Sequence, residues 1–324
     1  MKLWIQFPLL FIIFICSTVY WMNMKHSWTL YRSLYHQSTV EVASIEPNRG
    51  IFFAETTEKL EISSLVACAI ESASRTYPNR SIYFFMKGLT EDMTIFKSSF
   101  YKAIPLLSSI RNVYILPLNF GNVFKDTPLL PWYQKVITHK ERFWAHVSAE
   151  ACRLALIWKY GGIYMDTNII SMKLIPEEDF IATETAQDCS SGVFGFQQSH
   201  QFLWGCMEDY VKNYEGAIWG QQCPHLLIYM MKRLCHLDKF QNWEDSNCKN
   251  ISILYPQNLY RIPYPDWGRY FEIWDPKGTF ADFHAIPLLN IFKKNNAKLT
   301  TINHCPLTYK TFVKNEHINE TKKG

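Results

Sequence analysis

Two oxygen-bearing side chains stand two residues apart near the middle of the chain, in the run GGIYMDTNII at residues 161–170. The apolar residues before them predict a β-strand. Because alternate side chains of an extended chain share a face, we expect Tyr164, Asp166 and Asn168 on one side of that strand. Carboxylate and amide oxygens placed in this way can converge on a hard cation such as Mg²⁺ or Mn²⁺. Asp166 and Asn168 are therefore candidate metal ligands.

A polar trio precedes this run, on a helix predicted over residues 142–160. His146, Glu150 and Arg153 are spaced i, i+4 and i+7, which places them together on one side of the helix. The other side is an apolar stripe of Phe143, Val147, Ala151, Leu154 and Trp158. Taken alone, the trio is typical of a solvated face with a Glu–Arg pair that contributes about 0.2–0.5 kcal/mol.

The elements around these residues indicate an α/β fold. Gly161 and Gly162 end the helix, because glycine adopts the left-handed cap and tight turn that branched residues disfavour. Upstream, residues 51–55, 81–88 and 112–118 read as short apolar strands, and residues 59–77 read as a helix. Strands that alternate with helices predict a mostly parallel sheet, and ligands bind at the strand ends of such sheets.

Composition narrows the class of protein. The chain has 324 residues, a formal net charge of +4 and 48% hydrophobic residues, which is typical of a globular protein with a large core. Lys and Arg are not concentrated in any stretch, which argues against a nucleic-acid partner.

The N-terminus carries a membrane signal. Within residues 3–20 only Gln6, Ser17 and Thr18 are polar and none is charged, which approaches the ~20 residues of a membrane span. A cleaved signal peptide is the alternative, with Lys2 before the apolar core. We expect a short cytosolic end plus signal-anchor helix over 1–21, a stem over 22–48, the folded domain over 49–313 and a polar tail over 314–324.

Cysteines and glycosylation sequons also suit a secretory compartment. Eight cysteines lie outside the anchor without a C-x-x-C pair, and Cys235 with Cys248 is the expected local disulfide. Buried free thiols remain the alternative for several of the others. Asn79, Asn250 and Asn319 each begin an N-x-S/T sequon.

An ordered set of motifs resembles a known family. The motifs are PWYQ (131–134), CRLALIWKYGGIYMDTN (152–168), GVFGF (192–196), AIWGQQCP (217–224) and HCPLTYK (304–310). Together they resemble the α1,4-glycosyltransferases, which include α1,4-N-acetylglucosaminyltransferases of mucin-type O-glycans and lactosylceramide α1,4-galactosyltransferases. The similarity covers roughly residues 50–312.

The resemblance implies a GT-A fold, a Rossmann-like α/β domain that binds a UDP-sugar with Mn²⁺ or another divalent cation. It implies a single-pass type II protein of the Golgi membrane with a lumenal domain. The implied reaction moves GlcNAc from UDP-GlcNAc to a terminal β-galactose on O-glycans, with retention of anomeric configuration. Two alternatives stay open: an α1,4-galactosyltransferase acting on glycolipid, and a catalytically weak or inactive relative that serves as a Golgi binding protein for a partner transferase.

The resemblance also assigns residues. Asp166 resembles a metal and ribose contact, and Asn168 stands where the family has a metal-binding Asp. Glu150 and Arg153 resemble a pair that contacts the donor sugar. The segment IFFAET at residues 51–56 resembles the first strand of the family, whose end holds the uridine. Phe53, Glu55 and Thr56 are therefore candidate uridine contacts.

This chain departs from the family pattern at several positions. Ser191 replaces an Asn, Cys223 replaces a Gly, and Pro287 stands where a metal-binding His is usual. His284, three residues earlier, is a candidate replacement ligand. Asn168 can still coordinate through its amide oxygen, but it lacks the negative charge of Asp. The departures predict reduced activity, an altered metal preference or an inactive site.

Overall fold

The structure is a computed structural model that describes residues 45–89, 103–136, 141–176, 178–185, 189–214, 223–235, 248, 250–259, 285–287 and 305–308. The predicted anchor, most of the predicted stem, His284, Asn319 and the polar tail lie outside the described residues. Within those ranges, no helix combines the length and the apolar character needed to cross a membrane.

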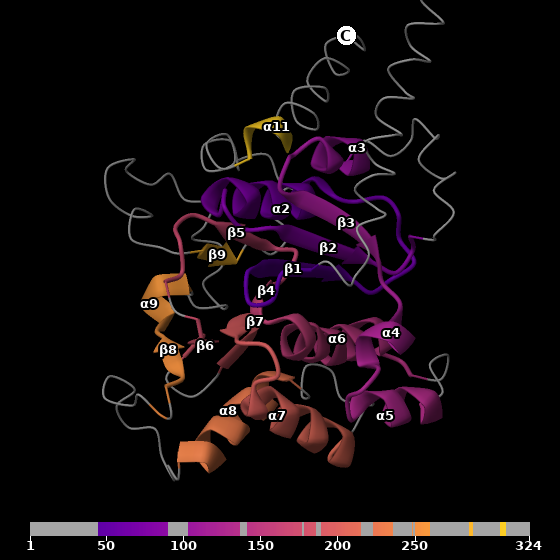
Figure 1. Cartoon of the computed structure of the whole chain (residues 1–324), viewed down its shortest axis with the longest axis vertical. Helices are drawn as coiled ribbons and strands as arrows, with labels where there is room; N and C mark the ends of the chain where they lie inside the picture. Colours follow the sequence, from indigo (N-terminus) through magenta and orange to yellow (C-terminus); the bar gives the residue numbers. More distant parts are fainter. Residues whose placement is uncertain are drawn as a thin grey trace, which may run out of the picture.

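Seven described strands form one mixed sheet in the order β3-β2-β1-β4-β7-β6-β8 (Figure 1). The strands are β1 (Gly50–Glu55), β2 (Ile82–Met86), β3 (Val113–Pro117), β4 (Gly162–Met165), β6 (Phe180–Thr183), β7 (Cys189–Phe196) and β8 (Ser252–Leu254). The pairings β1–β2, β1–β4, β2–β3 and β6–β8 are parallel, and β7 runs antiparallel to β4 and β6. The predicted α/β class and mostly parallel sheet are confirmed.

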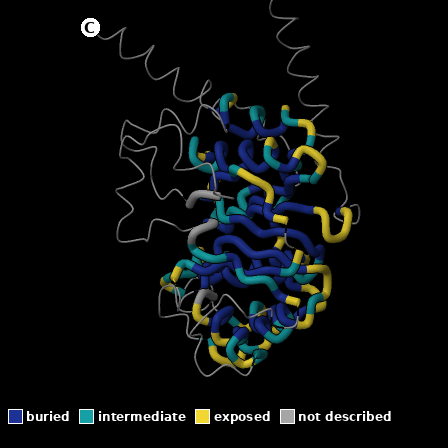
Figure 2. The backbone as a smooth tube through the Cα atoms, turned by 90° about the vertical axis from the view of Figure 1, so that its left-hand side faces the viewer, coloured by how far each residue is buried: buried dark blue, intermediate teal, exposed yellow. Residues whose placement is uncertain are grey.

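Helices cover both faces of the sheet (Figure 1). One face carries α2 (Ser64–Thr76), α3 (Ala103–Ser108) and α11 (Pro306–Thr308). The other carries α4 (Phe120–Phe124), α5 (Leu129–Lys135), α6 (Trp144–Tyr160), α7 (Gln201–Lys212) and α8 (Cys223–Cys235), while α9 (Pro256–Leu259) lies near β8. Buried residues run through the middle of the molecule, and exposed residues gather in the loops and outer helices (Figure 2).

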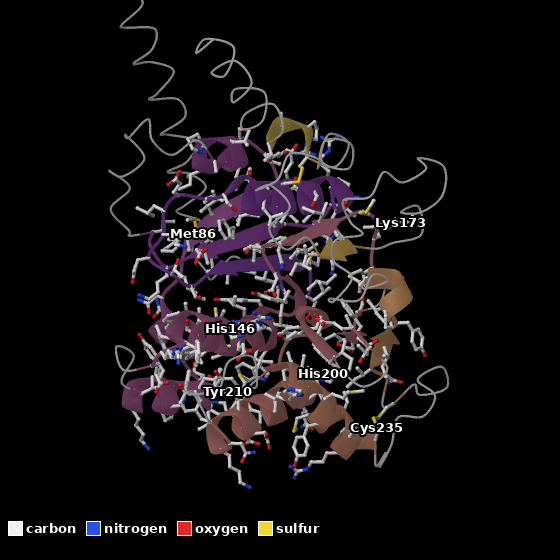
Figure 3. The ribbon with its side chains drawn as sticks, turned by 180° about the vertical axis from the view of Figure 1, so that it is seen from behind. Met86, His146, Lys173, His200, Tyr210 and Cys235 are labelled. Carbon is white, nitrogen blue, oxygen red and sulfur yellow. A yellow bond between two sulfur atoms is a disulfide. The ribbon has the colours of Figure 1, made fainter. Side chains whose placement is uncertain are left out.

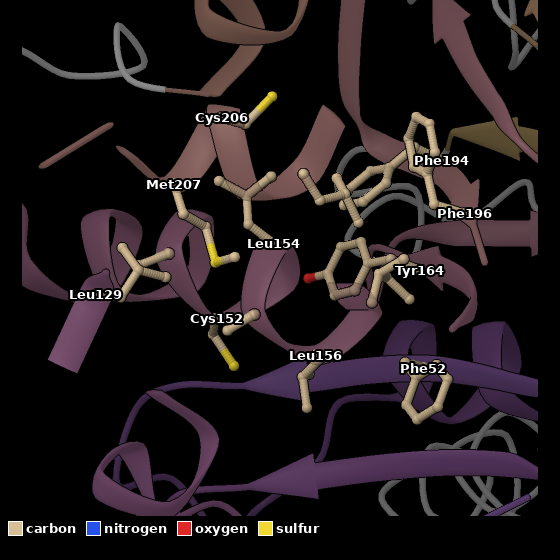
Figure 4. Close-up of a cluster of buried hydrophobic side chains, with 14 of the residues drawn as sticks. Phe52, Leu129, Cys152, Leu154, Leu156, Tyr164, Phe194, Phe196, Cys206 and Met207 are labelled. Carbon is tan, nitrogen blue, oxygen red and sulfur yellow. The ribbon is translucent and has the colours of Figure 1, made fainter. Parts of the chain in front are cut away.

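Each face of the sheet has its own hydrophobic core, as the apolar strands require. On β1 the side chain of Phe52 packs on the α6 side, with its ring 5.4 Å from Tyr83 and 5.8 Å from Tyr160. Phe53 packs into the core on the α2 side. Figure 4 shows Phe52, Leu154 and other members of the α6-side core. Burying one such ring stabilises the fold by about 1.5–3 kcal/mol.

The turn between α6 and β4 needs both of its glycines. Gly161 has a φ of 65° and Gly162 a φ of 113°, both in the left-handed region. A Cβ added at Gly162 would lie 2.2 Å from the backbone oxygen of Gly50, on the neighbouring strand. The predicted glycine turn is therefore confirmed, and it lets β4 lie directly beside β1.

Two disulfides join described segments. The predicted Cys235–Cys248 bridge is confirmed, and Cys68–Cys305 ties α2 to α11 across 237 positions of sequence. The buried carboxylate of Glu71 accepts hydrogen bonds from the backbone N–H groups of residues 307 and 308 at 3.0 and 2.8 Å. The C-terminal motif is thus held on the outer face of α2.

Candidate active site

The candidate site lies where β1 and β4 end and α6 begins. Because α6 runs back along the sheet before β4, its first turn meets the carboxyl ends of these parallel strands. Thr56, one residue beyond β1, donates its hydroxyl to the backbone oxygen of Ala145 at 2.8 Å. The contact ties the strand end to the helix start, at the edge where open α/β sheets bind ligands.

Arg153 and Asp166 form an ion pair at this edge. Arg153 Nη2 lies 3.1 Å from Asp166 Oδ1, and Nη1 lies 3.5 Å from Oδ2. Nη1 also donates to the backbone oxygen and the hydroxyl of Ser191, at 2.7 and 2.9 Å. Tyr164 donates its hydroxyl to Asp166 Oδ1 at 3.0 Å, and its ring lies under the Arg153 guanidinium at 4.9 Å. Arg153 of α6 and Tyr164 of β4 thus hold the Asp166 carboxylate, and Ser191 of β7 holds Arg153. We call these four residues the Arg153–Asp166 network.

Burial differs sharply among the charged groups. Glu150 and Arg153 are 1% and 5% exposed, so the prediction that the trio forms a solvated helix face is wrong. The reason is the sheet edge and β7, which cover this side of α6. The Asp166 side chain keeps 33% of its surface exposed, which makes its carboxylate the accessible end of the network.

His146 accompanies the network on the first turn of α6. Its Nε2 lies 3.4 Å from Glu150 Oε1, and 37% of its side chain is exposed. Burial and then the charge of Arg153 lower the pKa of His146, while Asp166 acts in the opposite direction. The imidazole is therefore neutral at pH 7, and a neutral ring can exchange protons or hydrogen bonds with a ligand.

Cys152 lies next to Arg153 in sequence but is not a nucleophile candidate. The residue is fully buried, and burial raises the pKa of its thiol to about 12 although Arg153 acts against the shift. A thiol in this state holds its proton at neutral pH and reacts poorly.

The strand ends before Asp166 and Asn168, both of which the predicted alternation included. β4 stops at Met165, and the backbone N–H of Ile169 bonds the oxygen of Asp166 at 3.0 Å, which closes a turn. The prediction that Tyr164, Asp166 and Asn168 share one face of a strand is therefore wrong, because residues 167 and 168 lie in a turn. Asp166 and Asn168 instead belong to the same turn.

Oxygen donors in this turn suit a hard cation. Asn168 Oδ1 is buried and has no hydrogen-bond partner in the structure, an arrangement that is costly unless a ligand satisfies it. Carboxylate and amide oxygens are the ligand types that Mg²⁺ and Mn²⁺ take. Among the described residues, no group of three or more His, Cys, Asp and Glu side chains could hold a metal ion.

The C-terminal part of the chain reaches this turn. β5 (Ile169–Ser171) pairs with β9 (Ala285–Pro287), and Pro287 stands opposite Ile169. The resemblance predicts a metal-binding His at position 287. That position lies opposite the residue that follows Asn168, but a proline has no side-chain atom that can coordinate.

The three candidate uridine contacts have different surroundings. Phe53 is fully buried in the α2-side core, so only its backbone is available to a nucleotide. Glu55 Oε1 accepts hydrogen bonds from the backbone and hydroxyl of Thr57 at 2.9 and 2.7 Å. Thr56 is buried and tied to α6. Glu55 is the member of the set with a partly exposed side chain.

Sequence reasoning did not assign Tyr164 and Ser191 to the site. Tyr164 precedes Asp166 by two residues, and this i, i+2 spacing was the sequence signal that their side chains could meet. Ser191 had no local signal, because it reaches Arg153 only through the pairing of β7 with β4.

Comparisons with known proteins match the chain to glycosyltransferases. Residues 63–187 match a family described as "Glycosyltransferase sugar-binding region containing DXD motif", and residues 195–312 match "Alpha 1,4-glycosyltransferase conserved region". Alpha-1,4-N-acetylglucosaminyltransferase of Homo sapiens is 40% identical over 313 residues, which cover 94% of this chain and 92% of that protein. Lactosylceramide 4-alpha-galactosyltransferase of Mus musculus is 35% identical, over 76% of this chain and 68% of that protein.

Among solved structures, the PaToxG glycosyltransferase matches 66% of this chain and 79% of its own, with 15% identity and a TM-score of 0.43. The match to the sugar-binding region spans residues 63–187, which include Arg153, Tyr164 and Asp166. The chain therefore belongs to the α1,4-glycosyltransferase family of UDP-sugar-dependent transferases.

Proposed function

We propose that the protein is a retaining α1,4-glycosyltransferase with a GT-A fold that moves GlcNAc from UDP-GlcNAc to a terminal β-galactose on O-glycans. The observation that carries the proposal is the Asp166 carboxylate. Arg153 holds it just after β4, and 33% of the Asp166 side-chain surface stays exposed. The GlcNAc donor is favoured over galactose because the human GlcNAc transferase matches 94% of this chain, whereas the mouse galactosyltransferase matches 76%.

Asp166 is the residue that meets the donor in this proposal. Oδ1 is occupied by Arg153 and Tyr164, whereas Oδ2 has a longer contact of 3.5 Å with Arg153 and is the freer oxygen. Arg153 is nearly buried, so we assign it to positioning and to lowering the negative potential that the diphosphate meets. Glu150 holds His146 at 3.4 Å and positions it at the same edge.

Asp166 and Asn168 would hold a divalent cation, which we propose to be Mn²⁺. That ion supplies Lewis-acid neutralisation of the diphosphate leaving group. Asn168 offers an uncharged oxygen, so the attraction of this turn for a cation is weaker than that of two carboxylates. The buried and unpartnered Oδ1 of Asn168 supports the assignment.

The reaction breaks the bond between the anomeric carbon and the diphosphate oxygen, and forms a bond from that carbon to O4 of galactose on the same face. The acceptor hydroxyl proton passes to the departing diphosphate. No side chain is assigned as a nucleophile, and the neutral thiol of Cys152 is unsuited to that role. Arg153 and Tyr164 keep Asp166 oriented throughout, which lowers the cost of reorganisation.

We further propose that residues 1–21 anchor the protein as a single-pass type II protein of the Golgi membrane, with a stem over 22–48, the lumenal GT-A domain over 49–313 and a polar tail over 314–324. Two disulfides support an oxidising compartment. The exposed sequon residues Asn79 and Asn250 support a lumenal domain.

Thermal melting of the full-length protein in detergent tests the donor. UDP, UDP-GlcNAc and UDP-Gal are added separately, each with and without Mn²⁺. A ligand at 100 times its Kd stabilises the folded state by about 2.7 kcal/mol. We expect the largest shift with UDP-GlcNAc and Mn²⁺ together. A larger shift with UDP-Gal would replace the donor assignment, and no shift with any nucleotide would refute the proposed function.

Asn168 and Pro287 favour a second candidate, a weak or inactive relative that serves as a Golgi partner of another transferase. A double variant, Asn168→Asp with Pro287→His, separates the two, since position 287 lies opposite Ile169 beside the turn. An inert parent whose double variant gains turnover would establish the second candidate. Any turnover by the parent would exclude an inactive relative, and parent turnover as fast as that of the double variant would exclude a weak one.

A further inference from the structure

A separate cavity of about 470 Å³ lies at the outer side of the first turn of α6. Its walls come from α5, the segment just before α6, and the end of α7, whereas the Arg153–Asp166 network comes from α6, β4 and β7. Four polar side chains line it together with apolar ones such as Pro131 and Val211. The polar four are Trp132, Lys135, Glu141 and Tyr214. Trp132 belongs to the PWYQ motif, to which the proposed function gives no role.

Trp132 is the most informative residue of the lining. It is only 6% exposed, and its indole N–H has no hydrogen-bond partner in the structure. Its ring lies edge-on to Tyr210 and Tyr214, with centroids 5.3 and 5.2 Å away, so the orientation of the indole is fixed by packing. A buried donor of this kind is costly unless an acceptor satisfies it, and a ligand in the cavity would supply that acceptor.

The other polar groups offer both kinds of hydrogen bond. Burial and the neighbouring carboxylate of Glu141 raise the pKa of Tyr214, which keeps its hydroxyl protonated. Glu141 accepts hydrogen bonds and Lys135 donates them. The set therefore suits a ligand that carries many hydroxyl groups, each of which donates and accepts.

Position links the cavity to the reaction site. Tyr210 donates its hydroxyl to the backbone oxygen of Val147 at 3.0 Å, which fastens the end of α7 to the first turn of α6. His146 lies on that same turn, and Figure 3 shows His146 and Tyr210 at the same end of α6. The cavity thus lies beside the first turn of α6, the end of that helix that meets the strand ends.

We propose that this cavity binds a sugar residue of the acceptor glycan. The inference rests on the proposed function and adds to it a recognition site for the acceptor. A pyranose matches the lining, because its hydroxyls pair with the polar groups and its C–H faces pack on Pro131 and Val211. The charges of Lys135 and Glu141 offset each other, so these two residues give no net positive charge that would favour a diphosphate, and a hydrocarbon would leave the Trp132 N–H unsatisfied. The volume falls within the range of ~300–1,000 Å³ that is usual for small-molecule sites.

The test measures acceptor binding directly. The full-length protein is titrated with a β-galactose-terminated trisaccharide and followed by saturation-transfer nuclear magnetic resonance, in the presence of UDP and Mn²⁺. Trp132→Phe keeps an aromatic ring and removes the indole N–H, and Tyr214→Phe removes one oxygen. The matched control is Trp204→Phe, because the Trp204 N–H bonds Glu208 at 2.9 Å on α7, outside the cavity lining.

We expect the Kd for the trisaccharide to rise about 3- to 10-fold in Trp132→Phe and in Tyr214→Phe, the loss of roughly one hydrogen bond. Trp204→Phe should leave that Kd within about twofold of the parent value. UDP affinity should stay unchanged in all three variants, which separates acceptor recognition from donor binding. Equal trisaccharide affinity in the parent, Trp132→Phe and Tyr214→Phe would overturn the inference. So would failure of the trisaccharide to bind a parent that binds UDP. Failure of the parent to bind any nucleotide would instead refute the proposed function.

Discussion

Replacing Arg153 by Lys removes the guanidinium that holds the candidate site together. Nη1 donates to Ser191 and makes a longer contact with Asp166 Oδ2, while Nη2 makes the shorter contact with Asp166 Oδ1, so both nitrogens are needed to hold the two partners. A lysine has one nitrogen and cannot reproduce this fork. At about 1.5–3 kcal/mol for a hydrogen bond to a charged group, one or two lost bonds correspond to about 1.5–6 kcal/mol. Because the Asp166 side chain is 33% exposed, water replaces part of its loss, and we expect about 2 kcal/mol.

Thermal melting and titration with UDP and Mn²⁺ give the two readouts for Arg153→Lys. A destabilisation of about 2 kcal/mol lowers the Tm of a domain of this size by about 4–8 °C. We also expect weaker UDP binding, because Asp166 loses its orientation. The matched control is Arg142→Lys, because Arg142 is exposed and lies just before α6. The free energy of unfolding of this variant should stay within about 0.5 kcal/mol of the parent value. An Arg153→Lys protein with the Tm and UDP affinity of the parent would refute the role given to the Arg153–Asp166 network.

Three further outcomes are expected. Asn168→Asp should tighten Mn²⁺ binding at least about tenfold in the presence of UDP, measured by calorimetry, because a neutral ligand becomes a carboxylate; unchanged affinity would remove this residue from the metal site. Cys68→Ser should lower the free energy of unfolding by about 3–5 kcal/mol in urea titration, since the bridge to Cys305 closes a long loop; a stable variant would contradict this. His200 accepts the N–H of Phe202 at 3.2 Å as the cap of α7, and burial lowers its pKa despite Asp179. Its contribution of about 1 kcal/mol is therefore present above about pH 6.5 and is lost as pH falls through the lower folded pKa. His200→Asn keeps a capping oxygen that does not titrate, so its melting temperature should fall less on acidification than that of the parent. If the melting temperatures of the parent and of His200→Asn fall equally as pH is lowered, protonation of His200 does not weaken the cap of α7.

Local pattern predicted the elements that carry the site. The apolar stripe on residues 143–158 predicted a helix, and α6 is observed over Trp144–Tyr160. Gly161 and Gly162 predicted the turn that follows. Both are local signals, because helical periodicity and a positive φ depend on neighbouring residues. The Cys235–Cys248 bridge was predictable for the same reason, since its two cysteines lie 13 positions apart.

Contacts between distant segments were not predictable in this way. Arg153 was expected on a solvated face because nothing on α6 reveals that β7 brings Ser191 against it, 38 positions later. The Cys68–Cys305 bridge spans 237 positions and follows from the docking of the C-terminal segment on α2. Alternation failed at Asp166 because a turn begins there, and alternation holds only for an extended chain.

The linkage in the reaction product is the decisive measurement for the proposed transferase. The full-length protein is incubated with UDP-GlcNAc, Mn²⁺ and a β-galactose-terminated acceptor, and the purified product is analysed by nuclear magnetic resonance. We expect GlcNAc joined in α configuration to O4 of the terminal galactose, and no product from Asp166→Ala protein that melts like the parent. A β linkage, attachment to another hydroxyl, or absence of UDP release from folded parent with every divalent metal tried would contradict the account.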